Sequence, residues 1–224
     1  MKPYFERDGV TIYHGDLFDV LPSLLPLEAV TITDPPYNVG LDYSGGDQRA
    51  DYAEWTRAWV ELMPRPLIVT PGMVNLCQWM QMEKPAWTCS WVKPNQCSPS
   101  GLQGFNVWEP ILVYGRPSRP VGQDAWVLPI RTNQEGVGDH PCPKFLPFWR
   151  RLIAAFSEPG GLILEPFMGS GTGPVAARDL GRRCIAIEIE ERYCEIAARR
   201  LDQQIMSLYV EPEHTVQATL EIAP

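Results

Sequence analysis

The four residues Asp34, Pro35, Pro36 and Tyr37 directly follow an apolar run of the sequence. A carboxylate can accept hydrogen bonds from a polar ligand, two consecutive prolines stiffen a loop, and an aromatic ring offers a flat face for stacking. A simple turn needs one proline and no aromatic residue. The pattern leaves two interpretations, a connecting loop or a chemical site, and the rest of the chain has to separate them.

A second stretch combines a buried strand, a glycine turn and a helix in the sequence GLILEPFMGSGTGPVAARDLG. The turn carries Gly169, Gly171 and Gly173, and the next apolar run contains an acidic residue, Glu188, near its end. Glycines let a backbone approach a ligand closely, and an acid at the tip of the second strand can bond ribose hydroxyls, so this order predicts a nucleoside-cofactor site. Pro174 breaks the spacing of dinucleotide enzymes. The alternative interpretation is a tight turn without a ligand.

Alternating apolar patterns predict the strands and helices that hold these two motifs. Short apolar runs predict strands at 10–16, 29–33, 66–70, 86–92, 110–115, 161–167 and 184–189. Helical spacing predicts helices at 17–25, 51–63, 73–82, 145–157, 173–181 and 190–205. The alternation is that of an α/β fold, and such sheets bind ligands at the carboxyl ends of their strands, where both motifs lie.

Length and composition set the broad class of the protein. The 224 residues, 45% of them hydrophobic, are enough for one well-buried core, so residues 1–224 are expected to form a single domain. No apolar run approaches the ~20 residues that span a bilayer, and the opening residues MKPYFERDGV lack the apolar core of a signal peptide, so we expect a cytoplasmic protein without a membrane partner. The six cysteines are scattered among only three histidines, so we expect reduced thiols and no metal site. The net charge of −8 disfavours non-specific coating of nucleic acid.

Taken together, the Asp-Pro-Pro-Tyr loop and the Phe-Met-Gly-Ser-Gly turn resemble the two signature motifs of the S-adenosylmethionine-dependent amino-methyltransferases that act on exocyclic amines of DNA bases. Their order looks like the circularly permuted beta group of that family, and His140, Pro141 and Lys144 match its His-Pro and Lys element. The resemblance covers nearly the whole chain. It implies a single Rossmann-like methyltransferase domain, with a mostly parallel seven-stranded sheet, one antiparallel strand and a circularly permuted order, and S-adenosylmethionine as the cofactor.

The resemblance implies that Asp34, Pro35, Pro36 and Tyr37 are the catalytic residues. The exocyclic amine of adenine or cytosine is a poor nucleophile because its lone pair is delocalised into the ring. The Asp34 carboxylate and the Pro35 carbonyl would accept hydrogen bonds from this amine and hold it in line with the methyl sulfonium, on a loop that the prolines stiffen. Tyr37 would stack on the target base after it is flipped out of double-stranded DNA.

The same resemblance assigns the glycine turn to the methionine end of the cofactor. Phe167, Gly169 and Gly171 would line the methionine portion. Glu165 would lie near its ammonium group, and Thr172 would stand at the head of the following helix.

The other end of the cofactor would meet residues from several elements. Glu188 would bond the ribose, Asp16 would lie near the adenine ring, and Asp34 would adjoin both the cofactor and the amine. His140 and Lys144 would close the pocket. For Asp16 the alternative is a simple helix N-cap, since an aspartate before a helix often has only that role.

The resemblance favours adenine N6 over cytosine N4 as the methylated amine. Asp34 at the first position of the loop and Asn38 after it look like the adenine enzymes, whereas cytosine enzymes of this group more often carry serine first. An inactive regulator or decoy that binds the cofactor and occupies DNA is the alternative of another class. The complete Asp-Pro-Pro-Tyr set disfavours it, because an inactive relative has no chemical need for all of these residues.

Target recognition is expected from two short segments, at about 94–108 and 116–138, because the chain has no separate recognition domain. Few base contacts fit on such segments, which predicts a short or degenerate target. Candidate base readers are Asn95, Gln96, Gln103, Asn106, Arg116, Arg119, Arg131 and Asn133. The nearby aromatics are expected in the core rather than stacked on bases; they are Trp91, Phe105, Trp108 and Trp126. A homodimer, as many relatives form, would widen the DNA-binding surface.

Overall fold

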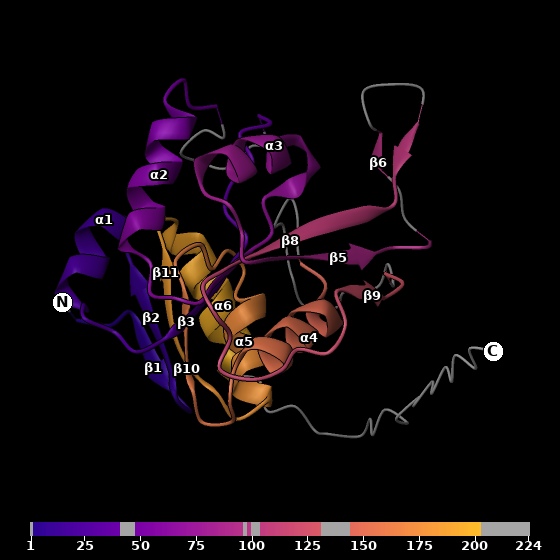
Figure 1. Cartoon of the computed structure of the whole chain (residues 1–224). Helices are drawn as coiled ribbons and strands as arrows, with labels where there is room; N and C mark the ends of the chain where they lie inside the picture. Colours follow the sequence, from indigo (N-terminus) through magenta and orange to yellow (C-terminus); the bar gives the residue numbers. More distant parts are fainter. Residues whose placement is uncertain (1, 41–47, 96–97, 100–103, 131–143, 203–224) are drawn as a thin grey trace.

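Among the residues that the structure describes, nine strands form one sheet in a computed structural model of the chain (Figure 1). The structure describes residues 2–40, 48–95, 98–99, 104–130 and 144–202. Along the sheet the strands are ordered β1, β2, β11, β10, β3, β4, β8, β5 and β9. Their bounds are β1 Phe5–Arg7, β2 Val10–His14, β3 Val30–Thr33, β4 Leu67–Val69, β5 Trp87–Val92, β8 Trp108–Tyr114, β9 Ala125–Val127, β10 Leu162–Glu165 and β11 Arg183–Glu188.

The sheet is mostly parallel, with β1 and β8 antiparallel to their neighbours. In the order along the sheet, the seven strands from β2 to β5 correspond to the expected seven strands, with β8 as the one antiparallel member. The expected total is wrong, because β1 and β9 add one strand to each edge. β1 has the sequence FER, with one apolar residue, and β9 is the short apolar piece AWV within a stretch rich in Pro, Gly and polar residues, so neither was among the predicted strands.

The order of the strands confirms the circular permutation. β3, which leads into the Asp34 loop, lies next to β10, which leads into the glycine turn, with Leu164 paired to Thr31. β3 nevertheless precedes β10 in the chain by more than half of the sequence. The two motifs therefore meet at one edge of the sheet although they are far apart along the chain.

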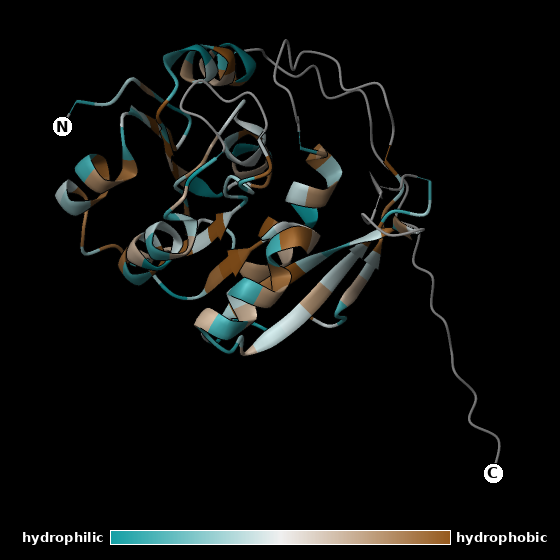
Figure 2. Ribbon diagram, turned by 90° about the horizontal axis from the view of Figure 1, so that it is seen from above, coloured by the Kyte–Doolittle hydropathy of each residue, from teal (hydrophilic) through white to brown (hydrophobic). Residues whose placement is uncertain are grey.

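Helices cover both faces of the sheet and produce two apolar cores (Figures 1 and 2). One face packs against the helices α4, α5 and α6, and the other packs against α1, α2 and α3. In β4, for example, Ile68 belongs to the first core, while Leu67 and Val69 belong to the second. The helix bounds are α1 Leu17–Val20, α2 Tyr52–Leu62, α3 Gly72–Met82, α4 Leu146–Phe156, α5 Thr172–Asp179 and α6 Glu191–Asp202, and a 3₁₀ turn, η1, covers Leu21–Ser23.

A small hairpin extends beyond the ends of β5 and β8 (Figure 1). It consists of β6, Ser98–Pro99, and β7, Phe105–Asn106, paired antiparallel. The expectation that the nearby aromatics lie in the core is confirmed for Trp91 and Trp126, which are each 3% exposed. It is wrong for Phe105, which is 69% exposed because β7 lies outside the main sheet and its helices.

Among the described residues, no helix is long and apolar enough to cross a membrane.

Parallel strands bring their carboxyl ends to a common edge. In this sheet that edge carries Asp16 just beyond β2, Asp34 after β3, Thr70 after β4, and Glu165 and Glu188 as the last residues of β10 and β11.

Candidate active site

A single pocket at the carboxyl edge of the sheet brings most of the predicted site residues together. Those that line it are Asp16, Asp34, Pro35, Pro36, Tyr37, Lys144, Glu165, Phe167, Gly169, Thr172 and Glu188. Gly171 is absent from the lining. His140 lies outside the described residues, so its predicted role stays a prediction.

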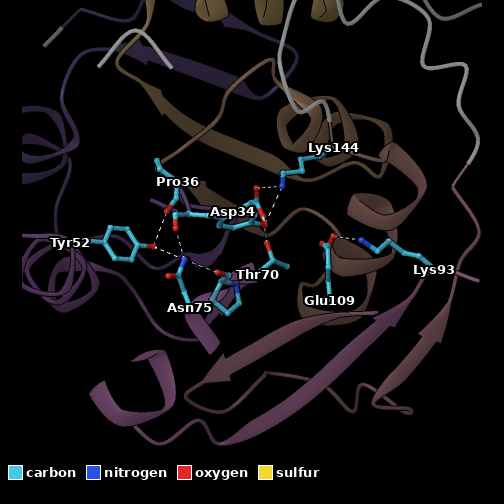
Figure 3. A network of polar contacts seen from close by, with 10 residues as sticks. Asp34, Pro36, Tyr52, Thr70, Asn75, Lys93, Glu109 and Lys144 are labelled. Atoms are coloured by element: carbon cyan, nitrogen blue, oxygen red, sulfur yellow. Dashed lines mark hydrogen bonds and ion pairs between the residues drawn. The ribbon is translucent and has the colours of Figure 1, made fainter. Parts of the chain in front are cut away.

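Hydrogen-bond donors from three separate segments hold the Asp34 carboxylate (Figure 3). Its Oδ1 accepts from the Tyr37 hydroxyl and, at 2.5 Å, from Oγ1 of Thr70. Its Oδ2 lies 2.5 Å from Nζ of Lys144, and this ammonium also lies 3.2 Å from the Tyr37 hydroxyl. A carboxylate has about four lone-pair positions, so these contacts leave room for one further donor on Oδ2. Lys144 thus contacts the predicted catalytic carboxylate directly.

The backbone of the Asp34 loop is fixed by two side chains that the sequence analysis did not single out. The hydroxyl of Tyr52, on α2, donates to the Pro36 carbonyl at 2.8 Å (Figure 3). The amide of Asn75, on α3, donates to the Tyr37 carbonyl at 2.8 Å. No described residue donates to the Pro35 carbonyl, so, unlike the carbonyls of Pro36 and Tyr37, it is left to accept a hydrogen bond from a ligand.

The side chain of Tyr37 is packed tightly beside two charges. Burial raises the pKa of Tyr37 well above its ordinary value, and the neighbouring Asp34 carboxylate adds to the shift, while Lys144 opposes it. The Lys144 ammonium lies 4.8 Å from the centre of the Tyr37 ring, within range of a cation–π contact. The phenol therefore remains protonated and donates a hydrogen bond to Asp34.

The Glu188 carboxylate binds the backbone of the glycine turn and of the residues that follow β11. Its Oε2 accepts from the backbone N–H of Gly169 at 2.7 Å, and its Oε1 accepts from that of Glu190 at 2.9 Å. Burial raises the pKa of Glu188, and these backbone donors pull the pKa back down. Each oxygen keeps a further lone pair, so the carboxylate can still accept hydrogen bonds from a ligand hydroxyl.

Glu165 is the most unusual acid of the pocket. It is 1% exposed, and its Oε2 has no hydrogen-bond partner among the described residues. Burial raises its pKa well above the ordinary value, and the negative charges of Asp34 and Glu188 raise it further. An unpartnered buried carboxyl oxygen is costly. The site therefore fits a cationic ligand group at this position, as the ammonium of S-adenosylmethionine would provide.

The glycine turn is held by an arginine that the sequence analysis missed. Nη1 of Arg200, on α6, donates to the Ser170 carbonyl at 2.6 Å and to Oγ1 of Thr172 at 3.2 Å. Gly171 has φ of +83°, and a Cβ there would lie 2.5 Å from Cβ of Ala197 on the same helix. The missing side chain therefore makes room for α6, and the predicted cofactor contact of Gly171 stays a prediction.

Two further predictions concern Asp16 and Phe167. Oδ1 of Asp16 accepts from the backbone N–H of Phe18 at 2.8 Å and caps α1, which confirms the N-cap interpretation. Asp16 also lines the pocket, and its role near the adenine ring stays a prediction. The Phe167 ring packs against Trp55 and Trp59 of α2, with ring centres 5.6 and 5.0 Å apart. Trp55 also lines the pocket.

The segment at about 94–108 is tied to its surroundings at both ends. Lys93 and Glu109, which flank it, form an ion pair (Figure 3). The amide of Asn95 exchanges hydrogen bonds with the backbone of Ile130, so this candidate reader supports loop structure. Arg116 and Arg119 are exposed, and Asn106 is half-buried. The other candidate readers lie outside the described residues; they are Gln96, Gln103, Arg131 and Asn133.

Comparisons with known proteins agree with this geometry. A family model described as DNA methylase, covering N6 and N4 methyltransferases, matches residues 73–199. The chain is 31% identical to the putative methylase YubD of Escherichia coli K12, over 84% of this chain and 88% of that protein. It is 26% identical to the Type II methyltransferase M.ScaI of Streptomyces caespitosus, over 93% of this chain and 86% of that protein.

Solved structures share the fold. A complex of M1.HpyAVI with SAM superposes with a TM-score of 0.66 at 24% identity, covering 87% of this chain and all of that one. The cytosine-N4-specific PvuII DNA methyltransferase gives a TM-score of 0.73 at 17% identity, covering 92% of this chain and 91% of that one. At such low identity these two likenesses establish the Rossmann-like methyltransferase fold.

Proposed function

This chain belongs to the family of N6 and N4 DNA methylases, and from that premise we propose that it methylates the exocyclic N6 amine of adenine in double-stranded DNA. The family uses S-adenosylmethionine as the methyl donor. The observation that carries the proposal is the meeting of two groups in one pocket: the Asp34 loop, whose Pro35 carbonyl accepts from no described residue, and the acids Glu165 and Glu188.

The cofactor end of the pocket is assigned from the acids. Bound S-adenosylmethionine supplies a methyl group activated by a positively charged sulfur. Glu165 would pair with its ammonium group, since Oε2 lacks a donor among the described residues, and Glu188 would accept from the ribose hydroxyls. Asp16 and Phe167 would line the rest of the cofactor, while Arg200 keeps Ser170 and the turn in place.

The amine end of the pocket is assigned from the Asp34 loop. The remaining lone pair on Asp34 and the carbonyl of Pro35 would each accept a hydrogen bond from the target amine. These contacts localise the amine lone pair, and the carboxylate stabilises the positive charge that develops on nitrogen, an effect of about 3 to 4 kcal/mol for one such group in other enzymes. Because Tyr52 and Asn75 hold the loop, little reorganisation is needed as the charge forms.

Tyr37 would stack on the flipped base. Extracting a base from the helix costs a few kcal/mol, and stacking on an aromatic ring returns about 1 to 3 kcal/mol. The base would stack on the face of the Tyr37 ring. In the ligand-free protein the ring is held at its edge, by the hydrogen bond from its hydroxyl to Asp34. Lys144 would balance the charge of Asp34 until the amine arrives.

The choice of adenine rests on the residue types of the loop. Asp34 stands at its first position and Asn38 follows it. The side chain of Asn38 pairs with the backbone of Arg49, accepting from its N–H at 2.5 Å, so Asn38 anchors the end of the loop. Cytosine N4 is the other amine that the family methylates, and product analysis separates the two.

We further propose that residues 1–224 act as one methyltransferase domain in the cytoplasm of a bacterial or phage-infected cell, with recognition from about 94–108 and 116–138. A bidentate base contact contributes about 1 to 3 kcal/mol of discrimination, so these segments would read about two to five base pairs, or a degenerate site. Methylation should weaken steeply as salt rises, because phosphate contacts carry much of the affinity. A homodimer would extend the surface available to DNA.

Transfer of tritium from labelled S-adenosylmethionine to DNA, RNA and protein, measured in parallel, tests the proposal. We expect label in double-stranded DNA alone and, after digestion to nucleosides, in N6-methyladenine. Label in N4-methylcytosine would show that the target base is cytosine rather than adenine, within the same family. Cofactor binding without incorporation into any polymer would instead favour the decoy.

A further inference from the structure

Thr70 occupies a position that the topology of the sheet fixes against Asp34. The adjacent parallel strands β3 and β4 pair Thr33 with Val69, so the next residues of each strand, Asp34 and Thr70, come side by side. Because side chains alternate between the two faces of a sheet, Asp34 and Thr70 lie on the same face as Ile32 and Ile68, which belong to one core. Any residue at position 70 would therefore point toward the carboxylate.

The contact itself is well fixed. Oγ1 of Thr70 lies 2.5 Å from Oδ1 of Asp34, and Thr70 is 4% exposed. Its backbone N–H donates to the Thr33 carbonyl at 3.1 Å, which continues the pairing of the two strands past their ends. A β-branched side chain has few rotamers, so the hydroxyl has little freedom to leave Asp34.

Thr70 differs in this respect from the other two donors to Asp34. Tyr37 lies on the loop, and its ring would be needed for the target base. Lys144 holds Oδ2, the same oxygen that has room for the amine. Both contacts would adjust when a base enters, whereas Thr70 holds Oδ1 from the end of a central strand.

We propose that Thr70 is a positioning residue for methyl transfer, keeping the Asp34 carboxylate turned so that Oδ2 can accept the target amine. The inference rests on the proposed function. It predicts that loss of the hydroxyl slows the methyl-transfer step while leaving the cofactor pocket intact, because Thr70 does not line that pocket.

Two substitutions separate the hydroxyl from the shape of the side chain. Thr70→Val keeps the branched shape and removes the donor, and Thr70→Ser keeps the donor and removes a methyl group. We expect Thr70→Val to lower the single-turnover rate about tenfold to a hundredfold, since small misplacements of a reacting group have effects of that size. Thr70→Ser should stay within about threefold of the wild-type rate, and S-adenosylmethionine affinity by calorimetry should stay within about threefold for both variants.

A Val variant as fast as the wild type, or a Ser variant as slow as the Val variant, would overturn the role of Thr70. A Val variant that lost cofactor affinity as strongly as rate would also overturn it, by indicating a merely structural residue. The wild-type rate is measured in the same experiment. Absence of transfer by the wild type would contradict the proposed function and, with it, this inference.

Discussion

A Cβ atom built on Gly173 would lie 1.9 Å from Oε2 of Glu165. The two residues belong to α5 and β10, and the missing side chain at position 173 leaves the space that the buried carboxyl fills. That carboxyl has no donor for Oε2 among the described residues. A cation that enters the pocket would give this oxygen a partner that no described residue provides, which makes the affinity for S-adenosylmethionine sensitive to the charge of Glu165.

We therefore predict that S-adenosylmethionine binds more tightly as pH rises from the ordinary glutamate pKa of 4.5 toward the raised pKa of Glu165. The ionised carboxylate is the form that pairs with a cation, so binding should release a proton. Glu165→Gln should weaken affinity and flatten this pH dependence. Calorimetry in buffers of different ionisation enthalpy measures both effects.

The stability of the ligand-free protein provides the matching control. Because the folded state raises the pKa of Glu165, its contribution to stability is complete below pH 4.5 and is lost as pH rises through the raised pKa. At a pH above the raised pKa, Glu165→Gln should therefore have a higher Tm than the wild type. Glu195→Gln, which changes an exposed side chain, should not raise the Tm. A Glu165→Gln variant with lower Tm and unchanged affinity would contradict this account of the pocket.

Substitution of Gly171 should act first on folding. A Cβ there meets Ala197, and φ of +83° disfavours any other residue, so Gly171→Ala should destabilise the protein by about 2 to 4 kcal/mol through strain and overpacking. Removing the facing methyl group in Gly171→Ala/Ala197→Gly should restore part of the loss. Thermal unfolding of the three variants, including Ala197→Gly alone, measures the coupling. Strict additivity of the two changes would show that the close approach is unimportant.

Arg200 should matter far more than its neighbour Arg199. Arg200→Met removes the donor to Ser170 and Thr172, and hydrogen bonds to charged groups are worth about 1.5 to 3 kcal/mol, so S-adenosylmethionine affinity should fall about tenfold or more. Arg199 is 69% exposed on its side chain and pairs only with Glu195 among the described residues. Arg199→Met should change stability by about 0.5 kcal/mol or less. Equal S-adenosylmethionine affinities of the two variants would contradict the role of Arg200 in holding the glycine turn.

Stacking by Tyr37 predicts different results for two substitutions. Tyr37→Phe keeps the ring and loses only the contacts of the hydroxyl with Asp34 and Lys144, so the rate of methyl transfer should stay within about tenfold of the wild type. Tyr37→Ala removes the stacking energy of about 1 to 3 kcal/mol and should reduce both base flipping and rate. Fluorescence of 2-aminopurine at the target position follows the flipping. A Phe variant as inactive as the Ala variant would assign the role to the hydroxyl instead.

Sequence reasoning located those site residues that lie at the ends of apolar strands. Asp34, Glu165 and Glu188 each follow or end such a run, and parallel topology brings these ends together. Thr70 follows the same kind of run, so the same rule could have found it. The edge strands were not recognised because β1 has only one apolar residue and β9 is three residues long in a stretch rich in Pro, Gly and polar residues.

Residues on helices could not be placed in this way. Tyr52, Asn75 and Arg200 reach the site only because their helices pack in particular orientations on the sheet, and sequence periodicity gives the buried face but not the neighbour. Gly171 illustrates the converse. Its place in a glycine turn predicts a cofactor contact, which stays a prediction, and the packing of α6 against it is a separate reason for the absence of a side chain.

Sequencing of methylated bases across the genome of a methylation-free bacterium, expressing either the wild type or Asp34→Ala, tests the central claim most directly. We predict N6-methyladenine at a short or degenerate target of about two to five base pairs with the wild type. None should appear with Asp34→Ala, although that variant should bind S-adenosylmethionine within about tenfold of the wild type. An unmethylated genome in cells that contain folded, cofactor-binding wild-type protein, or methylation that persists without the Asp34 carboxylate, would contradict the account.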